Sequence, residues 1–286
     1  MDTRLLNEWL AIPPGDLIAR SPLPLRVLDT ADEVGRYWAQ LMFQEFREAR
    51  EGGRDVSVIV PMGPDRQYPM LAELVNDAKL PLDHVTFFGM DEWLDWDGHR
   101  LPAEHPLSLR GLFDRMFLDR VEPVLRPRLE NVIFPSPTDL GRYAEEMRRR
   151  GGVDTTYGAF GMAGGVVAFN EPEPTRWTAV SLEQLRQSTT RIVEVGLDTR
   201  LLTADGAAGG NIFAVPSRAV TIGLREMLAA RRVRMLTDSG ARKRMMLRIL
   251  LFSEPTVEFP VTLFRDHPDL EVIADAAATV CPLPAL

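Results

Sequence analysis

The sequence of 286 residues contains one cysteine, Cys281, so no disulfide can form within the chain. It has no apolar run long enough to span a bilayer, and its first residues lack the basic start and apolar core of a signal peptide. Positive charge is also scarce, because 33 basic residues stand against 41 acidic ones and the net charge is −8. This balance argues against nucleic acid or an anionic membrane surface as the main partner. We therefore expect a soluble, cytoplasmic protein.

Strands alternate with helices over most of the chain. The first 29 residues are rich in proline and predict an N-terminal arm with one short strand, whereas residues 30–286 predict a single domain. Thr30–Glu33 has the pattern of a capping box and opens an amphipathic helix. The apolar runs that predict buried strands include residues 56–60, 85–90 and 233–237. This order predicts a Rossmann-like α/β fold, in which helices cover both faces of a mostly parallel sheet and ligands bind beyond the carboxyl ends of the strands.

Two carboxylates, Asp91 and Glu92, follow the strand predicted at 85–90. A carboxylate that is partly desolvated at a strand end has a raised pKa, which suits it to proton transfer next to a carbonyl group. Spacing alone favours a simpler interpretation, an acid that caps a helix or lies in a loop. Asp95 and Asp97 add carboxylates that could bind Mg²⁺, but their spacing is not diagnostic. Because no G-x-G-x-x-G follows a strand either, we predict neither a metal nor a cofactor.

Two further segments predict contacts with a small ligand. Gly164 and Gly165 lie in a glycine-rich turn, where the backbone can pass close to a ligand, and the apolar run behind them ends at Glu171, a candidate acid or base. Lys243 stands at the start of a predicted helix, where free N–H groups and the ammonium charge attract an anion. A solvated basic helix start explains Lys243 equally well.

Several motifs occur in the order that is typical of one family. They are F-G-M-D-E-W at 88–93, H-P-L-S at 105–108, A-F-N-E-P at 168–172 and V-P-S-R-A-V-T-I-G at 215–223. From about residue 30 to residue 268, the chain resembles the glucosamine-6-phosphate deaminase/isomerase family, to which the 6-phosphogluconolactonases are related. The resemblance implies a Rossmann-like, sugar-phosphate isomerase-like domain that needs no cofactor.

The resemblance also implies roles for individual residues. Asp91 would move a proton between C1 and C2 of the sugar, with Glu171 as its partner in the acid–base work. Arg191 lies in a segment similar to the family's S-R-T-R and Lys243 in one similar to G-x-x-K, so both would bind the substrate phosphate. Four more residues belong to these motifs or adjoin them and are predicted at the pocket: Glu92, His105, Gly164 and Gly165.

Some family features are missing from this sequence. The motif acid and the ring-opening histidine are absent, and Val166 stands where the imidazole belongs. The phosphate loop P-T-G-G-T-P reads P-M-G-P-D-R here, so Gly63 is retained, whereas Pro64 removes a donor N–H. Either Arg66 compensates for this loss or the pocket accepts a different group. We predict that Gly63 and Arg66 bind the phosphate. Because an acid–base catalyst contributes about 10²- to 10⁴-fold in rate, we expect poor deamination of glucosamine 6-phosphate.

The motifs together predict an isomerase- or deaminase-type enzyme of carbohydrate metabolism that acts on a small-molecule sugar or sugar phosphate. The alternative is a sensor that binds a sugar phosphate without turnover. Retention of Asp91 and Glu171 favours the enzyme, whereas the altered loop and Val166 favour the sensor. A 6-phosphogluconolactonase-like hydrolase is the weaker alternative, because those proteins continue with H-T-A-S-L-F-P. The oligomeric state, a homo-oligomer included, is left open.

Overall fold

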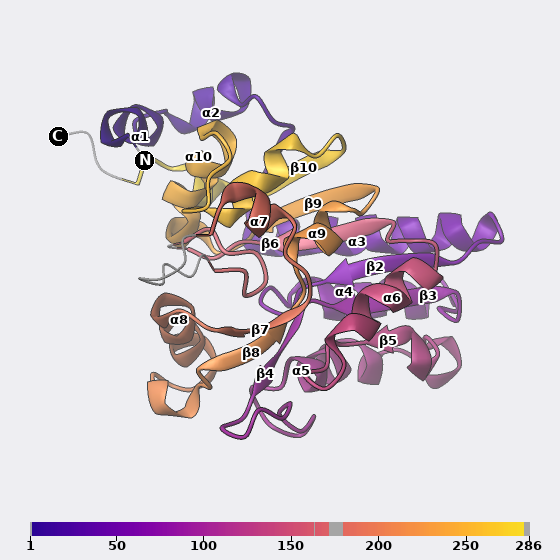
Figure 1. The fold of residues 1–286 in the computed structure, drawn as a ribbon. Helices are drawn as coiled ribbons and strands as arrows, with labels where there is room; N and C mark the ends of the chain where they lie inside the picture. Colours follow the sequence, from indigo (N-terminus) through magenta and orange to yellow (C-terminus); the bar gives the residue numbers. More distant parts are fainter. Residues whose placement is uncertain (1, 163, 172–179, 283–286) are drawn as a thin grey trace.

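The computed structural model describes residues 2–162, 164–171 and 180–282 (Figure 1). Its centre is a seven-stranded sheet in which all neighbouring strands are parallel. In order across the sheet, these strands are β1 (Leu25–Leu28), β10 (Leu270–Asp275), β9 (Arg232–Thr237), β6 (Thr155–Ala159), β2 (Val56–Val60), β3 (Val85–Gly89) and β5 (Val132–Ile133). The predicted α/β fold with a mostly parallel sheet is thereby confirmed.

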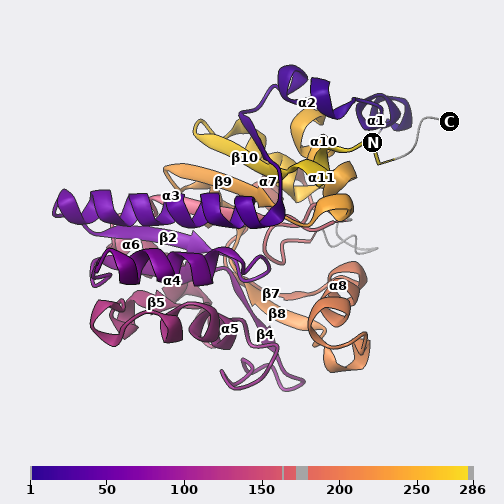
Figure 2. The same cartoon turned by 180° about the vertical axis from the view of Figure 1, so that it is seen from behind.

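Helices cover both faces of this sheet (Figures 1 and 2). On one face lie α3 (Ala31–Glu51), α4 (Gln67–Asp77) and α5 (Leu109–Met116), and on the other lie α6 (Leu140–Arg149), α9 (Leu224–Leu228) and α10 (Arg244–Phe252). Strand side chains alternate between the two, so that Val58 and Val60 of β2 pack into the core beneath α3, whereas Ile59 packs into the core beneath α6 and α10. Two hydrophobic layers therefore enclose the sheet.

The N-terminal 29 residues form α1 (Thr3–Leu10), α2 (Pro14–Arg20) and β1. The strand was predicted, and it pairs with β10, whereas the two helices were not predicted. Arg248 of α10 anchors this region, since its buried guanidinium donates to the carbonyl oxygens of Trp9 at 3.1 Å and Ile12 at 2.8 Å. In the part of the chain that the structure describes, no helix combines the length and apolarity needed to cross a membrane.

A second, three-stranded antiparallel sheet lies beyond the carboxyl edge of the first. It consists of β4 (Asp91–Leu94), β8 (Arg218–Thr221) and β7 (Arg191–Glu194), with β8 in the middle. Met90 is the only residue between β3 and β4, so the chain passes directly from one sheet to the other. Beside this sheet lies α8 (Leu197–Ala207), and the remaining described helices are α7 (Leu182–Arg186) and α11 (Ala276–Thr279). The second sheet was not predicted.

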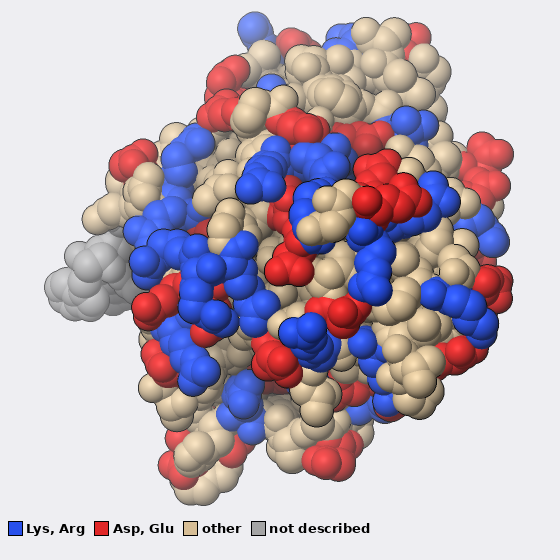
Figure 3. Space-filling view, turned by 90° about the vertical axis from the view of Figure 1, so that its right-hand side faces the viewer, with Lys and Arg blue, Asp and Glu red and all other residues tan. Residues whose placement is uncertain are grey.

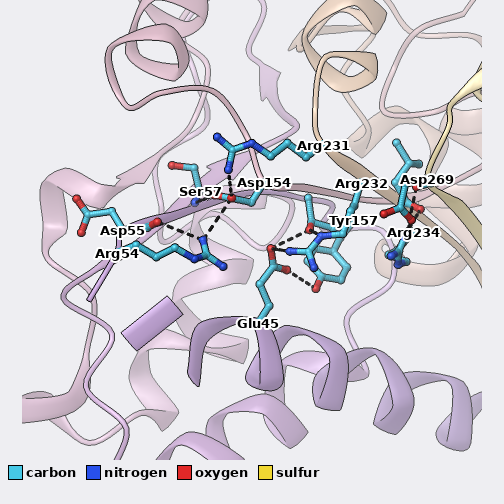
Figure 4. A network of polar contacts seen from close by, with 12 residues as sticks. Glu45, Arg54, Asp55, Ser57, Asp154, Tyr157, Arg231, Arg232, Arg234 and Asp269 are labelled. Carbon is cyan, nitrogen blue, oxygen red and sulfur yellow. Dashed lines mark hydrogen bonds and ion pairs between the residues drawn. The ribbon is translucent and has the colours of Figure 1, made fainter. Parts of the chain in front are cut away.

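The opposite, amino-terminal edge of the main sheet carries a buried polar network (Figure 4). Glu45 of α3 accepts hydrogen bonds from the Thr155 and Tyr157 hydroxyl groups, each at 2.8 Å, and forms an ion pair with Arg232. The network ties α3 to β6 and β9. Figure 3 views this side of the molecule and shows Lys and Arg side chains interleaved with Asp and Glu. The polar contacts at the amino-terminal edge therefore hold the fold together. Ligand binding is expected at the carboxyl edge.

Candidate active site

A cavity of about 660 Å³ lies beyond the carboxyl ends of the central strands. Its described lining comes from the loops that follow β2, β6 and β9, from the start of β4 and from α8. Because parallel strands end at the same edge, loops that are far apart in the sequence meet there. Of the residues predicted for the site, the structure brings together Asp91, Gly63, Arg66 and Lys243.

Asp91, the first residue of β4, has its carboxyl group at the wall of this cavity. The residue is 6% exposed, and no described residue donates a hydrogen bond to its carboxyl oxygens. Burial, followed by the charge of Glu92, raises its pKa to about 8. At neutral pH, the group therefore exchanges readily between its acid and base forms, which is the property that a proton carrier needs.

Glu92 points away from the cavity and holds the start of α5. Its carboxylate accepts hydrogen bonds from the backbone N–H groups of Leu109 at 2.9 Å and Arg110 at 2.8 Å, and from the Ser108 hydroxyl at 3.0 Å. A carboxylate at this position satisfies the unpaired N–H groups of a helix and interacts favourably with its dipole. Burial still raises the pKa of Glu92, although the backbone bonds oppose that rise. Glu92 does not line the cavity, contrary to the predicted pocket position.

Lys243 enters the cavity from the short 3₁₀ turn at Gly240–Lys243, which follows β9. Its side chain is largely buried and its ammonium group donates to the Phe160 carbonyl oxygen. Burial lowers the pKa of Lys243 to about 8, while the negative charge of Asp238 works in the opposite direction. Lys243 is thus a cation whose charge depends on its carboxylate neighbour and on any anion that enters the cavity.

Asp238 is a cavity residue that sequence analysis missed. It follows the last residue of β9, and its side chain is 12% exposed. Its carboxylate lies 3.6 Å from Nε of Arg66, whose Nη1 donates to Asp32 at 2.7 Å. Burial raises the pKa of Asp238, and the Arg66 charge lowers it. An acid directly after a predicted strand is the signal that singled out Asp91, and the same signal was available for Asp238.

Glu171 and Arg191 are not part of the described cavity lining. Oε1 of Glu171 accepts a hydrogen bond from the Thr199 hydroxyl at 2.8 Å, and Thr199 of α8 does line the cavity. Nη1 of Arg191, at the start of β7, donates to Oδ1 of Asn170 at 2.7 Å. The catalytic role of Glu171 and the phosphate-binding role of Arg191 stay predictions.

The helix α8 contributes further residues that sequence analysis did not assign, Asp198 and Thr199 among them. It begins immediately after Gly196, where an added Cβ would lie 2.0 Å from Oε2 of Glu171. A larger residue at this position would displace the Glu171 carboxylate. Arg242, next to Lys243, donates to Asp205 of α8 at 2.9 Å. This bond connects α8 to the turn that follows β9. Among the described residues, no group of three or more His, Cys, Asp and Glu side chains is arranged to hold a metal ion.

Known proteins resemble this chain in sequence over nearly its whole length, although no family model matches it. The glucosamine-6-phosphate deaminase of Caenorhabditis elegans is 26% identical over 264 residues, which cover 90% of this chain and 91% of that protein. The glucosamine-6-phosphate deaminase of Aedes aegypti is 27% identical over 264 residues, which cover 90% and 87%.

Solved structures share the fold. A monomeric glucosamine-6-phosphate deaminase has a TM-score of 0.75 at 22% identity, with 90% of this chain and 98% of that chain covered. The 6-phosphogluconolactonase of Leishmania guyanensis has a TM-score of 0.64 at 15% identity, with 90% and 97% covered. In sequence the chain is similar to glucosamine-6-phosphate deaminases, and in fold it is similar to glucosamine-6-phosphate deaminases and 6-phosphogluconolactonases. The low identities fit the divergence that the motifs predicted.

Three more of the predicted pocket residues lie outside the described lining. Gly165 has φ +59°, and a Cβ there would lie 2.7 Å from the Met246 sulfur, so glycine serves packing. Gly164 adjoins it in the same turn. His105 accepts a hydrogen bond from the Leu107 N–H at 3.1 Å, and that contact holds the loop whose next residues, Pro106 and Leu107, do line the cavity.

Val166 is a chemical difference between this chain and the family motif. It lines the cavity with an apolar side chain and is 5% exposed. No histidine is part of the described lining, and Glu171 is not part of it either. The described lining therefore presents two groups with a pKa of about 8, Asp91 and Lys243, and no imidazole beside them.

Proposed function

We propose that this protein is an isomerase- or deaminase-type enzyme that acts on a sugar phosphate or a closely related sugar. Asp91 takes a proton from the carbon next to the sugar carbonyl, which leaves an enediolate with its negative charge on the former carbonyl oxygen. The proton of the neighbouring hydroxyl group passes to that oxygen, and Asp91 returns its own proton to the former carbonyl carbon. The step moves protons within one substrate molecule and transfers no electrons to another molecule, so it needs no redox cofactor. Turnover of a suitable substrate is what sets this proposal apart from a sensor that only binds.

The observation that carries the proposal is the placement of Asp91. A carboxyl group at a cavity wall, buried and without a hydrogen-bond donor among the described residues, carries a pKa of about 8. A binding protein for anions gains nothing from such a group, whereas an enzyme that shuttles a proton depends on it. The similarity to glucosamine-6-phosphate deaminases in sequence supports the substrate class.

The cavity also supports a specialised reaction. Val166 supplies no proton, so opening of a sugar ring lacks the catalyst that an imidazole provides. We therefore infer that proton transfer on the open-chain form of a sugar is faster than deamination of the cyclic form of glucosamine 6-phosphate.

Exchange of carbon-bound hydrogen in D₂O tests the proposal. The protein is incubated with fructose, fructose 6-phosphate, glucosamine or glucosamine 6-phosphate, and loss of the proton signals at C1 and C2 is followed by NMR while ammonia is assayed in parallel. We expect exchange with at least one of the four compounds, and ammonia release at a lower rate than exchange.

The control variant is Asp97→Asn, which removes a carboxylate six residues further on whose side chain is 58% exposed and outside the cavity lining. It should exchange hydrogen at the wild-type rate, whereas Asp91→Asn should not. Binding of a sugar without any exchange would refute the enzyme and identify the protein as a sensor.

A further inference from the structure

The three cations in the described lining of the cavity are all engaged by oxygen atoms of the protein itself. Arg66 interacts with Asp32 at 2.7 Å and with Asp238 at 3.6 Å. Arg242 donates to Asp205 at 2.9 Å, and Lys243 donates to the Phe160 carbonyl oxygen. An incoming phosphate would have to compete with these partners for every positive charge at this end of the cavity.

The carboxylates along the wall offset its cations. Within the described lining, three cations, Arg66, Arg242 and Lys243, stand against three acids besides Asp91, whose raised pKa keeps it mostly neutral at pH 7: Asp65, Asp198 and Asp238. Two more carboxylates, those of Asp32 and Asp205, form ion pairs with Arg66 and Arg242, respectively. A phosphate dianion placed here meets like charges at short range in a region where Asp238 is shielded from water.

The loop after β2 has two residues that disfavour a phosphate. It contains Pro64, which has no N–H group to offer, and Asp65, which adds a negative charge. A neutral hydroxyl group is accommodated far better, because it can donate to the Asp238 carboxylate and accept from Arg66 or Lys243. Such an arrangement of a carboxylate between two cations is suited to a diol or a hydroxymethyl group.

We propose that this cavity takes an unphosphorylated sugar and that Asp238 is the residue that excludes a phosphate group. The carboxylate of Asp238 neutralises the cations that would otherwise hold the phosphate, and it repels a dianion. The proposal rests on the proposed function for the location of the sugar, and it narrows the substrate class of the same site.

Matched pairs of ligands test the proposal on the wild-type protein. Calorimetric titration compares glucosamine with glucosamine 6-phosphate, and fructose with fructose 6-phosphate, at pH 7 and constant ionic strength. We expect the unphosphorylated member of at least one pair to bind at least about tenfold more tightly. Tighter binding of the phosphorylated members would overturn this proposal and leave the proposed function standing. Failure of all four to bind would refute both.

The variant Asp238→Asn keeps the shape of the side chain and removes its charge. We expect its affinity for the phosphorylated members to rise about tenfold or more, because Arg66 and Lys243 become available to the phosphate. The control Asp269→Asn also removes one carboxylate from an ion pair, with Arg234 at 2.8 Å, but outside the described cavity lining, and should leave the preference unchanged. An unchanged preference in a folded Asp238→Asn variant would contradict the proposal. If that variant does not fold, the wild-type comparison still decides it.

Discussion

Asp91 and Glu92 are neighbours in the chain, yet their carboxyl groups serve opposite sides of β4. Asp91 lines the cavity, whereas Glu92 accepts hydrogen bonds from Leu109 and Arg110 at the start of α5. The alternation of side chains along a strand separates them. One charge still acts on the other, since the negative charge of Glu92 contributes to the raised pKa of Asp91. A helix cap and a proton carrier are thus built from consecutive residues.

The first prediction concerns turnover. Asp91→Asn should reduce hydrogen exchange on the substrate by about 10³-fold or more, since the amide cannot accept the proton. Affinity for the sugar should stay within about threefold, which calorimetric titration would measure. Full exchange with weakened binding would show that Asp91 is a ligand-contact residue and not the proton carrier.

The second prediction concerns stability and pH. Asp91 has a pKa of about 8 when folded, against an ordinary value of 3.8, so above pH 3.8 the folded protein keeps a proton that the unfolded chain loses. Its contribution to stability is complete below pH 3.8 and is lost as the pH rises through about 8. Between pH 5 and pH 8 the wild-type free energy of unfolding should fall more than that of Asp91→Asn, by up to about 4 kcal/mol at about 1.4 kcal/mol per pKa unit.

Denaturant unfolding at pH 5 and pH 8 measures this difference. Asp97→Asn, in which the lost carboxylate is exposed, should follow the wild-type pH dependence. Parallel curves for wild type and Asp91→Asn would mean that the Asp91 carboxyl group ionises at an ordinary pH.

The third prediction concerns Lys243. The chain contains two lysines, Lys79 and Lys243, so an amine reagent followed by mass spectrometry reports each of them separately. Because burial lowers the pKa of Lys243 to about 8, its reactivity should rise with a midpoint near pH 8. Asp238→Asn should move that midpoint lower, since Asp238 favours the charged form. A midpoint above pH 10 in the wild-type protein would be inconsistent with the buried position.

The fourth prediction concerns Glu92. Replacement by Gln substitutes an NH₂ group for an oxygen that accepts backbone N–H bonds, so the free energy of unfolding should fall by about 1–3 kcal/mol. Loss of the negative charge should also lower the pKa of Asp91 and move the pH profile of hydrogen exchange toward lower pH. A purely structural role of Glu92 would leave that profile in place, so the shift is the informative measurement.

Patterns confined to a short segment predicted their structures well. The capping box is formed as expected, with the Thr30 hydroxyl accepting from the Glu33 N–H and the Glu33 carboxylate accepting from the Thr30 N–H, each at 3.2 Å. The strand predicted at 56–60 is β2, and all five of its residues are buried. Interactions within a few residues determine such elements, which is why their sequence alone is sufficient.

Pairings between distant segments were not predictable in the same way. In the second sheet, Asp91 pairs with Thr221, and Thr221 pairs with Arg191 on its other side. All three segments belong to family motifs, but no local pattern in any of them specifies its antiparallel partner. The same limit applies to Arg66, which precedes α4. Its ion pairs with Asp32 in the first turn of α3 and with Asp238 after β9 join three segments that are far apart in the sequence.

By itself, the sequence determined the alternation of strands and helices and the parallel sheet, because hydrophobic periodicity is a local property. Motif spacing, which is also local, located Asp91 and Lys243 and showed that Val166 replaces the imidazole. Only the tertiary structure decided which of those groups share one cavity and which, such as Glu92, serve a helix instead. It also decided the charge environment of Asp91 and Lys243, since desolvation and ion pairing arise from atoms that packing brings together. Asp238 has the same sequence signal as Asp91, an acid directly after a predicted strand, but only the tertiary structure shows that it lines the cavity and pairs with Arg66.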